Sequence, residues 1–359
     1  MSTPPISPRD DLALVEGYHS PQLDVAVRLN TNESPYPPPE GWKRELAAEV
    51  ERIEWNRYPD RAAAKLRAAV AGFHGIDPAT VLCANGSNEA LQALCLAFGG
   101  AGRRAITFEP GYALHAWIAR ITGTEVVEAE RAEDFTLAPD AAMTALEKAG
   151  PDLVFLASPN NPTGLVEQED TVAAVADWAA AHRAVLVVDE AYAEFAPWSA
   201  LDMVDEGRTL AVTRTFSKTW SMAAARLGYL VGPPWMVGEL EKVLLPYHMS
   251  AVIQAAGRLA LGWSDEMHGR VASLVEERER LVRALDELSV DVWPSGANFI
   301  LFRPRGLPGA EVWQGLVDRS VLVRNCSSWP RLRGCLRVTV GTPEEDERFL
   351  TALREILAS

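Results

Sequence analysis

The sequence predicts an α/β protein with a large, mainly parallel sheet flanked by helices and a second, smaller α+β domain. From about Val81, short apolar runs alternate with longer stretches of helical period, which is the pattern of βαβ units. From about Asp265, a long charged amphipathic stretch leads into short expected strands and helices with an α+β pattern. The change in pattern therefore marks the start of the smaller domain.

The expected strands of the large sheet are short and rich in Val, Leu or Ile, as strands buried on both faces should be. They span residues 81–84, 104–108, 153–157, 184–188, 210–215 and 227–231. Apolar residues at helical spacing fill the segments between them, as over 89–98 and 170–181. In the smaller domain we expect helices over 266–288, 310–319 and 344–357, and strands over 290–293, 298–302 and 336–339.

Three parts are expected along the chain. Residues 1–40 form an N-terminal arm, residues 41–265 the large domain and residues 266–359 the small domain. Within the arm, the segment Ser-Pro-Tyr-Pro-Pro-Pro (34–39) cannot form regular structure, because each proline fixes φ and removes a donor. We expect this segment to be an extended strap over another surface, such as that of a partner subunit.

Charge and composition exclude several classes of function. The 359 residues include 34 basic and 49 acidic side chains, a net charge of −15 that repels nucleic acid. No apolar run is long enough to span a membrane, and the first residues lack the apolar core of a signal peptide. The four cysteines show neither CxxC spacing nor accompanying histidines, which predicts no metal site and no disulfides. We expect a cytoplasmic protein.

Lys218 is the first candidate for chemistry. It lies in Thr-Phe-Ser-Lys (215–218), directly after the expected strand 210–215 and thus at the carboxyl edge of the sheet, where ligands usually bind. Burial there lowers the pKa of an amine and leaves it nucleophilic, as the formation of a Schiff base requires. The alternative is an ordinary surface lysine.

Other polar side chains follow neighbouring strands at the same edge. Asp189 ends one strand and offers a carboxylate that can keep a pyridine nitrogen protonated; the alternative is a helix N-cap. Tyr192, three residues later, can reach an oxygen on such a ring. Asn161, in a tight Pro- and Gly-containing turn, offers an amide to the same oxygen. Tyr112 can lay its ring over the pyridine, with core packing as the alternative.

A phosphate group would find donors nearby. A turn between an expected strand and helix contains Asn85, Gly86 and Ser87, and free N–H groups at a helix start bind phosphate. Thr215 and Ser217 add hydroxyls beside the lysine. Arg226 adds a fixed positive charge.

Two arginines of the small domain lie inside strand patterns. Arg324 and Arg337 are flanked by apolar residues, and an arginine is costly to bury without an anionic partner. We therefore predict that Arg337 binds the anionic group of a substrate. An internal salt bridge is the alternative.

Together these residues resemble the class I/II aminotransferases of pyridoxal 5′-phosphate (PLP) fold type I, and most closely the histidinol-phosphate aminotransferases. The resemblance runs from about Tyr18 to the C-terminus. Besides the turn at Gly86 and Arg226, it is carried by Leu-Asn-Thr-Asn-Glu-Ser-Pro-Tyr (29–36), Arg-Tyr-Pro-Asp (57–60), residues 158–164, Asp-Glu-Ala-Tyr (189–192), Ser-Lys (217–218) and Leu-Arg-Val-Thr-Val-Gly-Thr (336–342). It implies a sheet of the seven-stranded type and PLP as the cofactor.

The resemblance also implies a role for each residue. Lys218 would carry PLP as a Schiff base and move a proton on the substrate, and Asp189 would pair with the pyridine nitrogen. Asn161 and Tyr192 would bind the ring oxygen, and Tyr112 would stack on the ring. The phosphate would be held by Ser217, Arg226, the backbone near Gly86 and, from the neighbouring subunit of a homodimer, Tyr58. The substrate pocket would be lined by Tyr18, Tyr247, Arg324 and Arg337.

The implied reaction moves the amino group of glutamate to imidazole-acetol phosphate, a step of histidine biosynthesis. One arginine-rich site can serve both substrates, since a phosphomonoester takes the place of the glutamate carboxylate. Three segments depart from the family pattern, at Gly111, 220–225 and 325–329. Three alternatives stay open: an aromatic amino acid aminotransferase, a phosphoamino-acid decarboxylase or eliminating enzyme, and a non-catalytic PLP-binding module.

Overall fold

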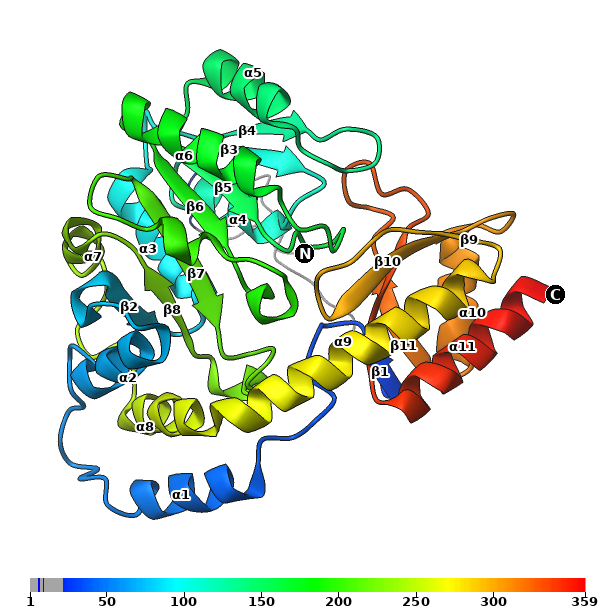
Figure 1. The fold of residues 1–359 in the computed structure, drawn as a ribbon, viewed down its shortest axis with the longest axis horizontal. Helices are drawn as coiled ribbons and strands as arrows, with labels where there is room; N and C mark the ends of the chain where they lie inside the picture. Colours follow the sequence, from blue (N-terminus) through cyan, green and yellow to red (C-terminus); the bar gives the residue numbers. More distant parts are fainter. Residues whose placement is uncertain (1–5, 7–8, 10–21, 359) are drawn as a thin grey trace.

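The computed structural model describes Ile6, Arg9 and residues 22–358, and two sheets organise this part of the chain (Figure 1). The larger sheet has seven strands in the order β2-β8-β7-β6-β5-β3-β4. Its strands are β2 (Val81–Ala84), β3 (Arg104–Glu109), β4 (Glu125–Glu130), β5 (Leu153–Ala157), β6 (Val185–Asp189), β7 (Leu210–Thr215) and β8 (Gly228–Val231).

The larger sheet is mainly parallel, as predicted. Strand β8 alone among these seven runs antiparallel to its neighbours, β2 and β7. The six strands expected from the sequence are all present, within one residue at each end. The seventh, β4, was missed because its sequence Glu-Val-Val-Glu-Ala-Glu lacks a continuous apolar run. It lies at the edge of the sheet, where half-exposed acidic side chains are tolerated and discourage pairing with another chain.

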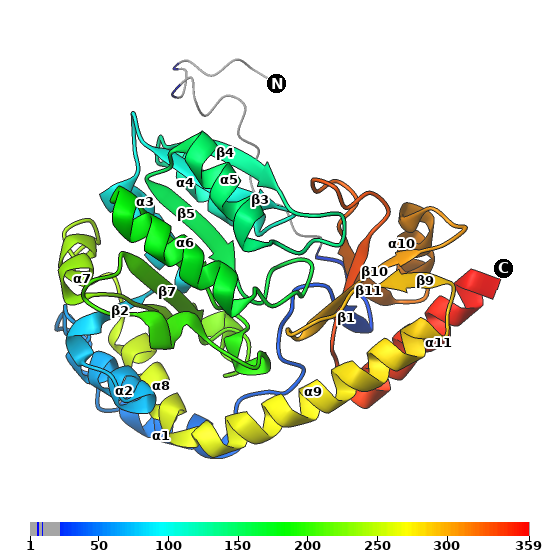
Figure 2. The same cartoon turned by 45° about the horizontal axis from the view of Figure 1, so that its top comes forward.

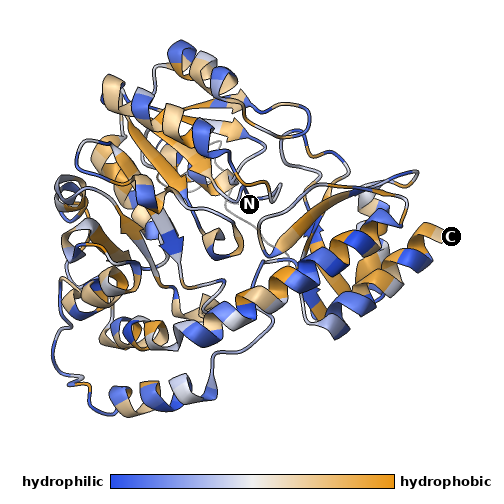
Figure 3. Cartoon of the chain, viewed as in Figure 1, coloured by the Kyte–Doolittle hydropathy of each residue, from blue (hydrophilic) through white to orange (hydrophobic). Residues whose placement is uncertain are grey.

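Helices cover both faces of this sheet (Figures 1 and 2). Alternate strand residues pack on one face against α3 (Ser87–Phe98), α4 (Ala113–Ile121) and α7 (Pro234–Leu240). The residues between them pack on the other face against α5 (Pro139–Ala149) and α6 (Glu169–His182). Because both faces are covered, the central strands are mainly apolar, and Figure 3 shows them largely in the colour of hydrophobic residues.

A third apolar cluster lies beside β2 and β8. It includes side chains of α1 (Glu40–Val50), α2 (Ala64–His74), α8 (Ala251–Ala260) and the start of α9 (Ser264–Asp286). Helix α9 then runs on as a long rod to the second sheet (Figure 2). None of the helices in residues 22–358 is long and apolar enough to cross a membrane.

The second sheet has five strands in the order β1-β11-β12-β10-β9. These strands are β1 (Val27–Leu29), β9 (Val290–Val292), β10 (Phe299–Pro304), β11 (Val321–Asn325) and β12 (Leu336–Thr339), and α10 (Gly309–Asp318) and α11 (Pro343–Ala358) accompany them. Strand β1 pairs in parallel with β11, so a segment near the N-terminus completes a sheet built from the C-terminal part of the chain. Three residues are too few to give a strand pattern, and β1 was not predicted.

The two sheets place polar side chains opposite one another. Strands β5, β6 and β7 are paired in register, with Ala157 opposite Asp189 and Asp189 opposite Thr213. Their carboxyl ends therefore meet at one edge of the large sheet. The segment after β1, together with β12 of the second sheet, lines the far side of the same edge. Residues 34–39 contain no helix or strand, as expected from their prolines.

Candidate active site

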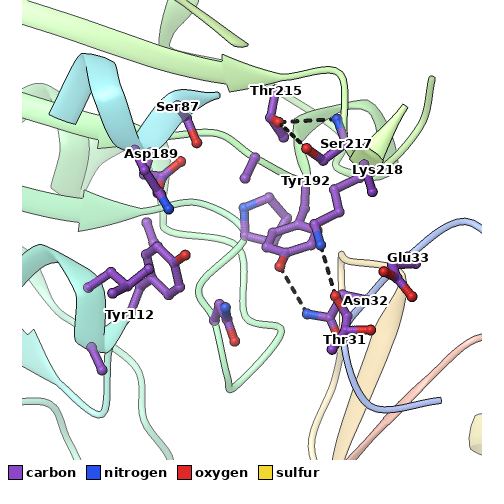
Figure 4. Close-up of a pocket in the computed structure, with 18 of the residues that line it drawn as sticks. Thr31, Asn32, Glu33, Ser87, Tyr112, Asp189, Tyr192, Thr215, Ser217 and Lys218 are labelled. Atoms are coloured by element: carbon purple, nitrogen blue, oxygen red, sulfur yellow. Dashed lines mark hydrogen bonds between the residues drawn. The ribbon is translucent and has the colours of Figure 1, made fainter. Parts of the chain in front are cut away.

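A cavity of about 420 Å³ opens at this edge, between the large sheet and the second sheet (Figure 4). Residues from both sheets and from the segment after β1 contribute to its wall. The predicted site residues that line it are Ser87, Tyr112, Asn161, Asp189, Tyr192, Thr215, Ser217, Lys218, Arg226 and Arg337. Side chains predicted from separate stretches of the sequence thus line the same cavity.

Lys218 projects into the cavity from the turn after β7. Its Nζ donates a hydrogen bond to the backbone oxygen of Thr31, at 2.9 Å (Figure 4). Burial lowers the pKa of Lys218 to about 7; Arg337 and Arg226 act in the same direction, and Glu33 opposes them. Near neutral pH the amine is therefore neutral in a large fraction of molecules, which makes it nucleophilic.

Asp189 lies at the end of β6 and is held by two side chains. Its Oδ1 accepts a hydrogen bond from the hydroxyl of Thr213, at 3.1 Å, and its Oδ2 lies 3.1 Å from Nε2 of His115. Asp189 and His115 are both buried. The carboxylate is therefore fixed in position rather than free to turn.

His115 was missed by the sequence analysis. Its ring stacks on Phe155 with centroids 5.1 Å apart and meets Tyr112 edge-on at 5.2 Å. The signal that points to it is position: His115 lies in the first turn of α4, three residues after the predicted Tyr112, whose backbone oxygen accepts a hydrogen bond from the His115 N–H at 2.9 Å.

Hydrogen bonds to described residues help to fix the orientation of Asn161 and of Tyr192. The Oδ1 of Asn161 accepts a hydrogen bond from Nη1 of Arg337, so its Nδ2 group is left to donate to another acceptor. The Tyr192 hydroxyl accepts from Nδ2 of Asn32, at 2.9 Å. Both side chains line the cavity and carry a group that can donate a hydrogen bond.

Hydroxyl groups and an arginine cluster at one end of the cavity. The hydroxyls of Thr215 and Ser217 lie 3.0 Å apart, and Nη1 of Arg226 lies 3.4 Å from the Ser217 oxygen. Gly86 adopts φ +79°, and a Cβ placed on it would lie 3.0 Å from Nη2 of Arg226. The lack of a side chain at Gly86 leaves room beside Arg226, at the start of helix α3. This set of donors fits a phosphate group.

Asn85 precedes this cluster but does not line the cavity. Its amide donates to the carboxylate of Glu89 and to the backbone oxygen of His248. The side chain of Asn85 therefore fixes the turn that presents Gly86 and Ser87.

Arg337 faces the cavity from β12. Its Nη2 donates to the backbone oxygen of Asn30, at 3.0 Å, and its Nη1 donates to Asn161. Both partners are neutral, and Nε has no hydrogen-bond partner among the described residues. Within the part of the chain that the structure describes, Arg337 makes no salt bridge, and its positive charge faces the cavity.

The remaining predicted residues lie elsewhere. Arg324 is buried with its guanidinium 5.4 Å from the ring centre of Trp329, and Trp329, not Arg324, is in the cavity wall. Tyr58 and Tyr247 stack on one another with ring centres 4.6 Å apart, and they are 80% and 43% exposed. Tyr18 lies outside the described residues.

Comparison with known proteins identifies the family. The family described as aminotransferase class I and II matches residues 24–353. The chain belongs to the class I and II aminotransferases. The predicted fold class, PLP-dependent transaminase activity and PLP as cofactor are thereby confirmed.

Relatives of this aminotransferase share most of its length. A histidinol-phosphate aminotransferase of Frankia casuarinae is 47% identical over 97% of this chain and 90% of that protein. One from Streptomyces avermitilis is 46% identical over 97% of this chain and 96% of that protein. The solved histidinol-phosphate aminotransferase of Sinorhizobium meliloti, in complex with pyridoxal-5′-phosphate, has the same fold, with a TM-score of 0.82 at 23% identity over 93% of this chain and 91% of that one.

The residues of the cavity fit PLP. An amine of lowered pKa stands beside a fixed carboxylate, two side chains that donate hydrogen bonds, and an anion cradle at Gly86. Those are the groups that an aldehyde, a pyridine nitrogen, a ring oxygen and a phosphate require.

Proposed function

We propose that this aminotransferase moves the amino group of glutamate to imidazole-acetol phosphate, giving histidinol phosphate and 2-oxoglutarate in histidine biosynthesis. The observation that carries the proposal is the buried guanidinium of Arg337, which faces the cavity and whose hydrogen-bond partners among residues 22–358 are neutral. One such site can take the carboxylate of glutamate and the phosphate of the other substrate in turn. The names of the two curated relatives support this choice of substrates.

Lys218 is the proposed attachment point and proton carrier. PLP, when bound, supplies an electron sink for the bond changes at the substrate Cα. The Nζ of Lys218, neutral in a large fraction of molecules near pH 7, accepts the proton from that carbon and returns it at the other end of the transfer. Its hydrogen bond to Thr31 holds the amine inside the cavity while it is free.

The ring of the cofactor is held by the large sheet. We assign Asp189 to the pyridine nitrogen, where a carboxylate keeps the nitrogen protonated, and Thr213 and His115 hold that carboxylate still. The Nδ2 of Asn161 and the hydroxyl of Tyr192 donate to the ring oxygen. Tyr112 packs over the ring.

The phosphate of the cofactor is assigned to the cluster around Arg226. Thr215, Ser217 and the backbone near Gly86 and Ser87 supply its donors. Asn85 contributes indirectly, because its side chain fixes the turn that presents Gly86 and Ser87 to the phosphate.

A homodimer completes the proposed site. Trp55, Tyr58 and Leu245 are 71%, 80% and 78% exposed, and exposed large apolar side chains favour contact with another chain. We propose that a second copy covers them, and that Tyr58 of each subunit reaches the phosphate of the other.

The proposal also includes the residues that bind the substrate and the division of the chain into domains. Arg337 binds the anionic group of both substrates, and Arg324, Tyr247 and Tyr18 complete the pocket in the assembled enzyme. Residues 41–265 form the cofactor-binding domain, residues 266–359 the small domain, and residues 1–40 the arm. A cytoplasmic location fits the four cysteines, which are free and buried.

A half-reaction on the purified holoenzyme tests the proposal. Glutamate, histidinol phosphate and phenylalanine are each mixed with the enzyme, and the visible absorbance of the bound cofactor is followed without an amino acceptor. We expect glutamate and histidinol phosphate to bleach the band and phenylalanine to act far more slowly. A preference for phenylalanine would favour the aromatic aminotransferase, and release of carbon dioxide from a phosphoamino acid would favour the decarboxylase.

A further inference from the structure

The loop between β11 and β12 (residues 326–335) reaches from the second sheet to the large-sheet side. It carries Trp329, which lines the cavity. Figures 1 and 2 show this orange-red loop beside the segment that joins β4 to α5. Leu332 of the loop and Phe135 of that segment are buried in one apolar cluster. The loop therefore connects one wall of the cavity with the large-sheet side.

Arg331 makes the polar part of this contact. Its Nη1 donates to the backbone oxygens of Glu109, at 3.4 Å, and of Arg131, and its Nη2 donates to that of Ala132 at 3.0 Å. Its guanidinium carbon lies 5.8 Å from the ring centre of Phe135. A guanidinium presents its donors in a rigid planar fork, which suits several acceptors at once. One side chain of the loop thus binds three backbone carbonyls of the large-sheet side.

The segment that accepts these hydrogen bonds is held by a buried side chain of its own. Arg131 donates through Nε to the backbone oxygen of Phe108, at 3.1 Å, and through Nη1 to that of Phe135, at 3.4 Å. Its Nη2 forms an ion pair with the carboxylate of Glu167, which is also buried. The carbonyls that Arg331 contacts are therefore fixed points on the large-sheet side.

Within the loop, the backbone couples Arg331 to Trp329. The N–H of Trp329 donates to the backbone oxygen of Cys326 at 3.0 Å, and the backbone oxygen of Trp329 accepts from the N–H of Leu332 at 3.2 Å. Arg331 lies inside this second turn. It adopts φ +63°, which residues with a Cβ rarely adopt and which persists only where surrounding contacts stabilise it. The hydrogen bonds of the Arg331 side chain are such contacts.

We propose that Arg331 is a positioning residue for substrate specificity. It holds the loop against the large-sheet side, so that Trp329 stays in the cavity wall and its ring packs on an aromatic ring of the substrate. The inference rests on the proposed function, which gives one substrate an imidazole ring. Flat aromatic side chains favour stacked contacts with other rings. Because glutamate has no ring, Arg331 should affect the binding of histidinol phosphate and much less that of glutamate.

Arg331→Met tests the proposal by steady-state kinetics on the holoenzyme. Methionine is also unbranched at Cβ, so the backbone at φ +63° is strained no more than before, but its side chain cannot donate to the three carbonyls. We expect the KM for histidinol phosphate to rise about fivefold with kcat nearly unchanged, and the KM for glutamate to change less than about twofold. An equal rise for both substrates would show a general effect of charge or folding and would overturn the inference.

Arg333→Met is the matched control. Arg333 is exposed in the same loop, so this variant removes the same charge two residues away from the contact. Both KM values should stay as in the unmodified enzyme. In the Trp329→Leu background, Arg331→Met should add nothing to the KM for histidinol phosphate, because the ring that it positions is absent. A further rise in that background would mean that Arg331 acts on the substrate by another route, contrary to the inference.

A measurement without substrate tests the position of the Trp329 ring directly. In holoenzyme labelled with fluorotryptophan, the fluorine NMR resonance of Trp329 is the one that Trp329→Leu removes. We expect Arg331→Met to shift or broaden this resonance, because the loop loses its polar contact, and Arg333→Met to leave it in place. An unmoved resonance in Arg331→Met would show that the apolar cluster alone holds the loop, and the inference would then be wrong. Failure of the unmodified enzyme to react with histidinol phosphate would count against the proposed substrates only, since this measurement uses none.

Discussion

The two sides of the cavity differ in how directly the sequence determines them. On the large-sheet side, Asn161, Asp189 and Lys218 lie at or shortly after the ends of β5, β6 and β7, and all three line the cavity. On the second-sheet side Arg337 lines it, whereas Arg324 contacts the ring of Trp329 and is not in the cavity wall. Carboxyl ends of parallel strands meet at one edge whatever the connecting loops do. The second sheet has no such rule, because its contribution depends on how two sheets and a loop pack together.

Lys218→Ala tests the large-sheet side with the largest expected effect. Without the amine, both the anchoring of PLP and the proton transfer are lost, so we expect the visible band and multiple turnover to disappear together. Absorbance and coupled transamination assays measure the two. Lys148→Ala, which removes an amine from the last turn of α5, is the matched control and should behave as the unmodified enzyme. Multiple turnovers by Lys218→Ala would remove this residue from its proposed role.

Arg337→Ala tests the second-sheet side. The loss of a charge-assisted hydrogen-bonded pair should weaken the transition-state binding of glutamate and of histidinol phosphate by about 2 to 4 kcal/mol each, roughly 30- to 1,000-fold in kcat/KM. Steady-state kinetics with each substrate measure the effect. Arg303→Ala, an exposed arginine in the neighbouring strand β10, should have little effect. A loss confined to one substrate would show that the two anions do not share Arg337.

The same contrast explains what the sequence could and could not predict. Buried strands were predictable because continuous Val, Leu and Ile runs are typical of strands covered on both faces. The candidate site residues could then be located at the ends of these strands. Edge strand β4 and the short strand β1 lack such runs. His115 and Asn32 were missed as site residues because each contacts a partner far away in sequence, Asp189 for His115 and Tyr192 for Asn32. Neither contact leaves a spacing pattern that links the two partners.

The pH dependence of PLP capture by the apoenzyme depends on both sides of the cavity, because it involves Lys218 from one side and Arg337 from the other. Lys218 is protonated and unreactive below its pKa of about 7 and neutral above it, so the rate at which the apoenzyme captures PLP should rise about tenfold per pH unit below pH 7 and level off above it. Stopped-flow absorbance measures this rate. Since Arg337 is one of the charges that lower this pKa, Arg337→Ala should move the midpoint to higher pH. A midpoint near the ordinary lysine value would mean that the amine is solvated.

Trp329→Leu should have the smallest effect and should leave the large-sheet side untouched. Trp329 lines the cavity and its ring contacts the Arg324 guanidinium, a contact worth about 1 kcal/mol when partly exposed. Leucine gives neither this contact nor a flat surface on which an imidazole ring can stack, so we expect the KM for histidinol phosphate to rise about fivefold with kcat nearly unchanged. Glutamate, which has no imidazole ring, should be affected less. The visible absorption band of the bound cofactor should not change, because Trp329 lies on the second-sheet side; a change would show that the two sides are coupled through the loop between β11 and β12.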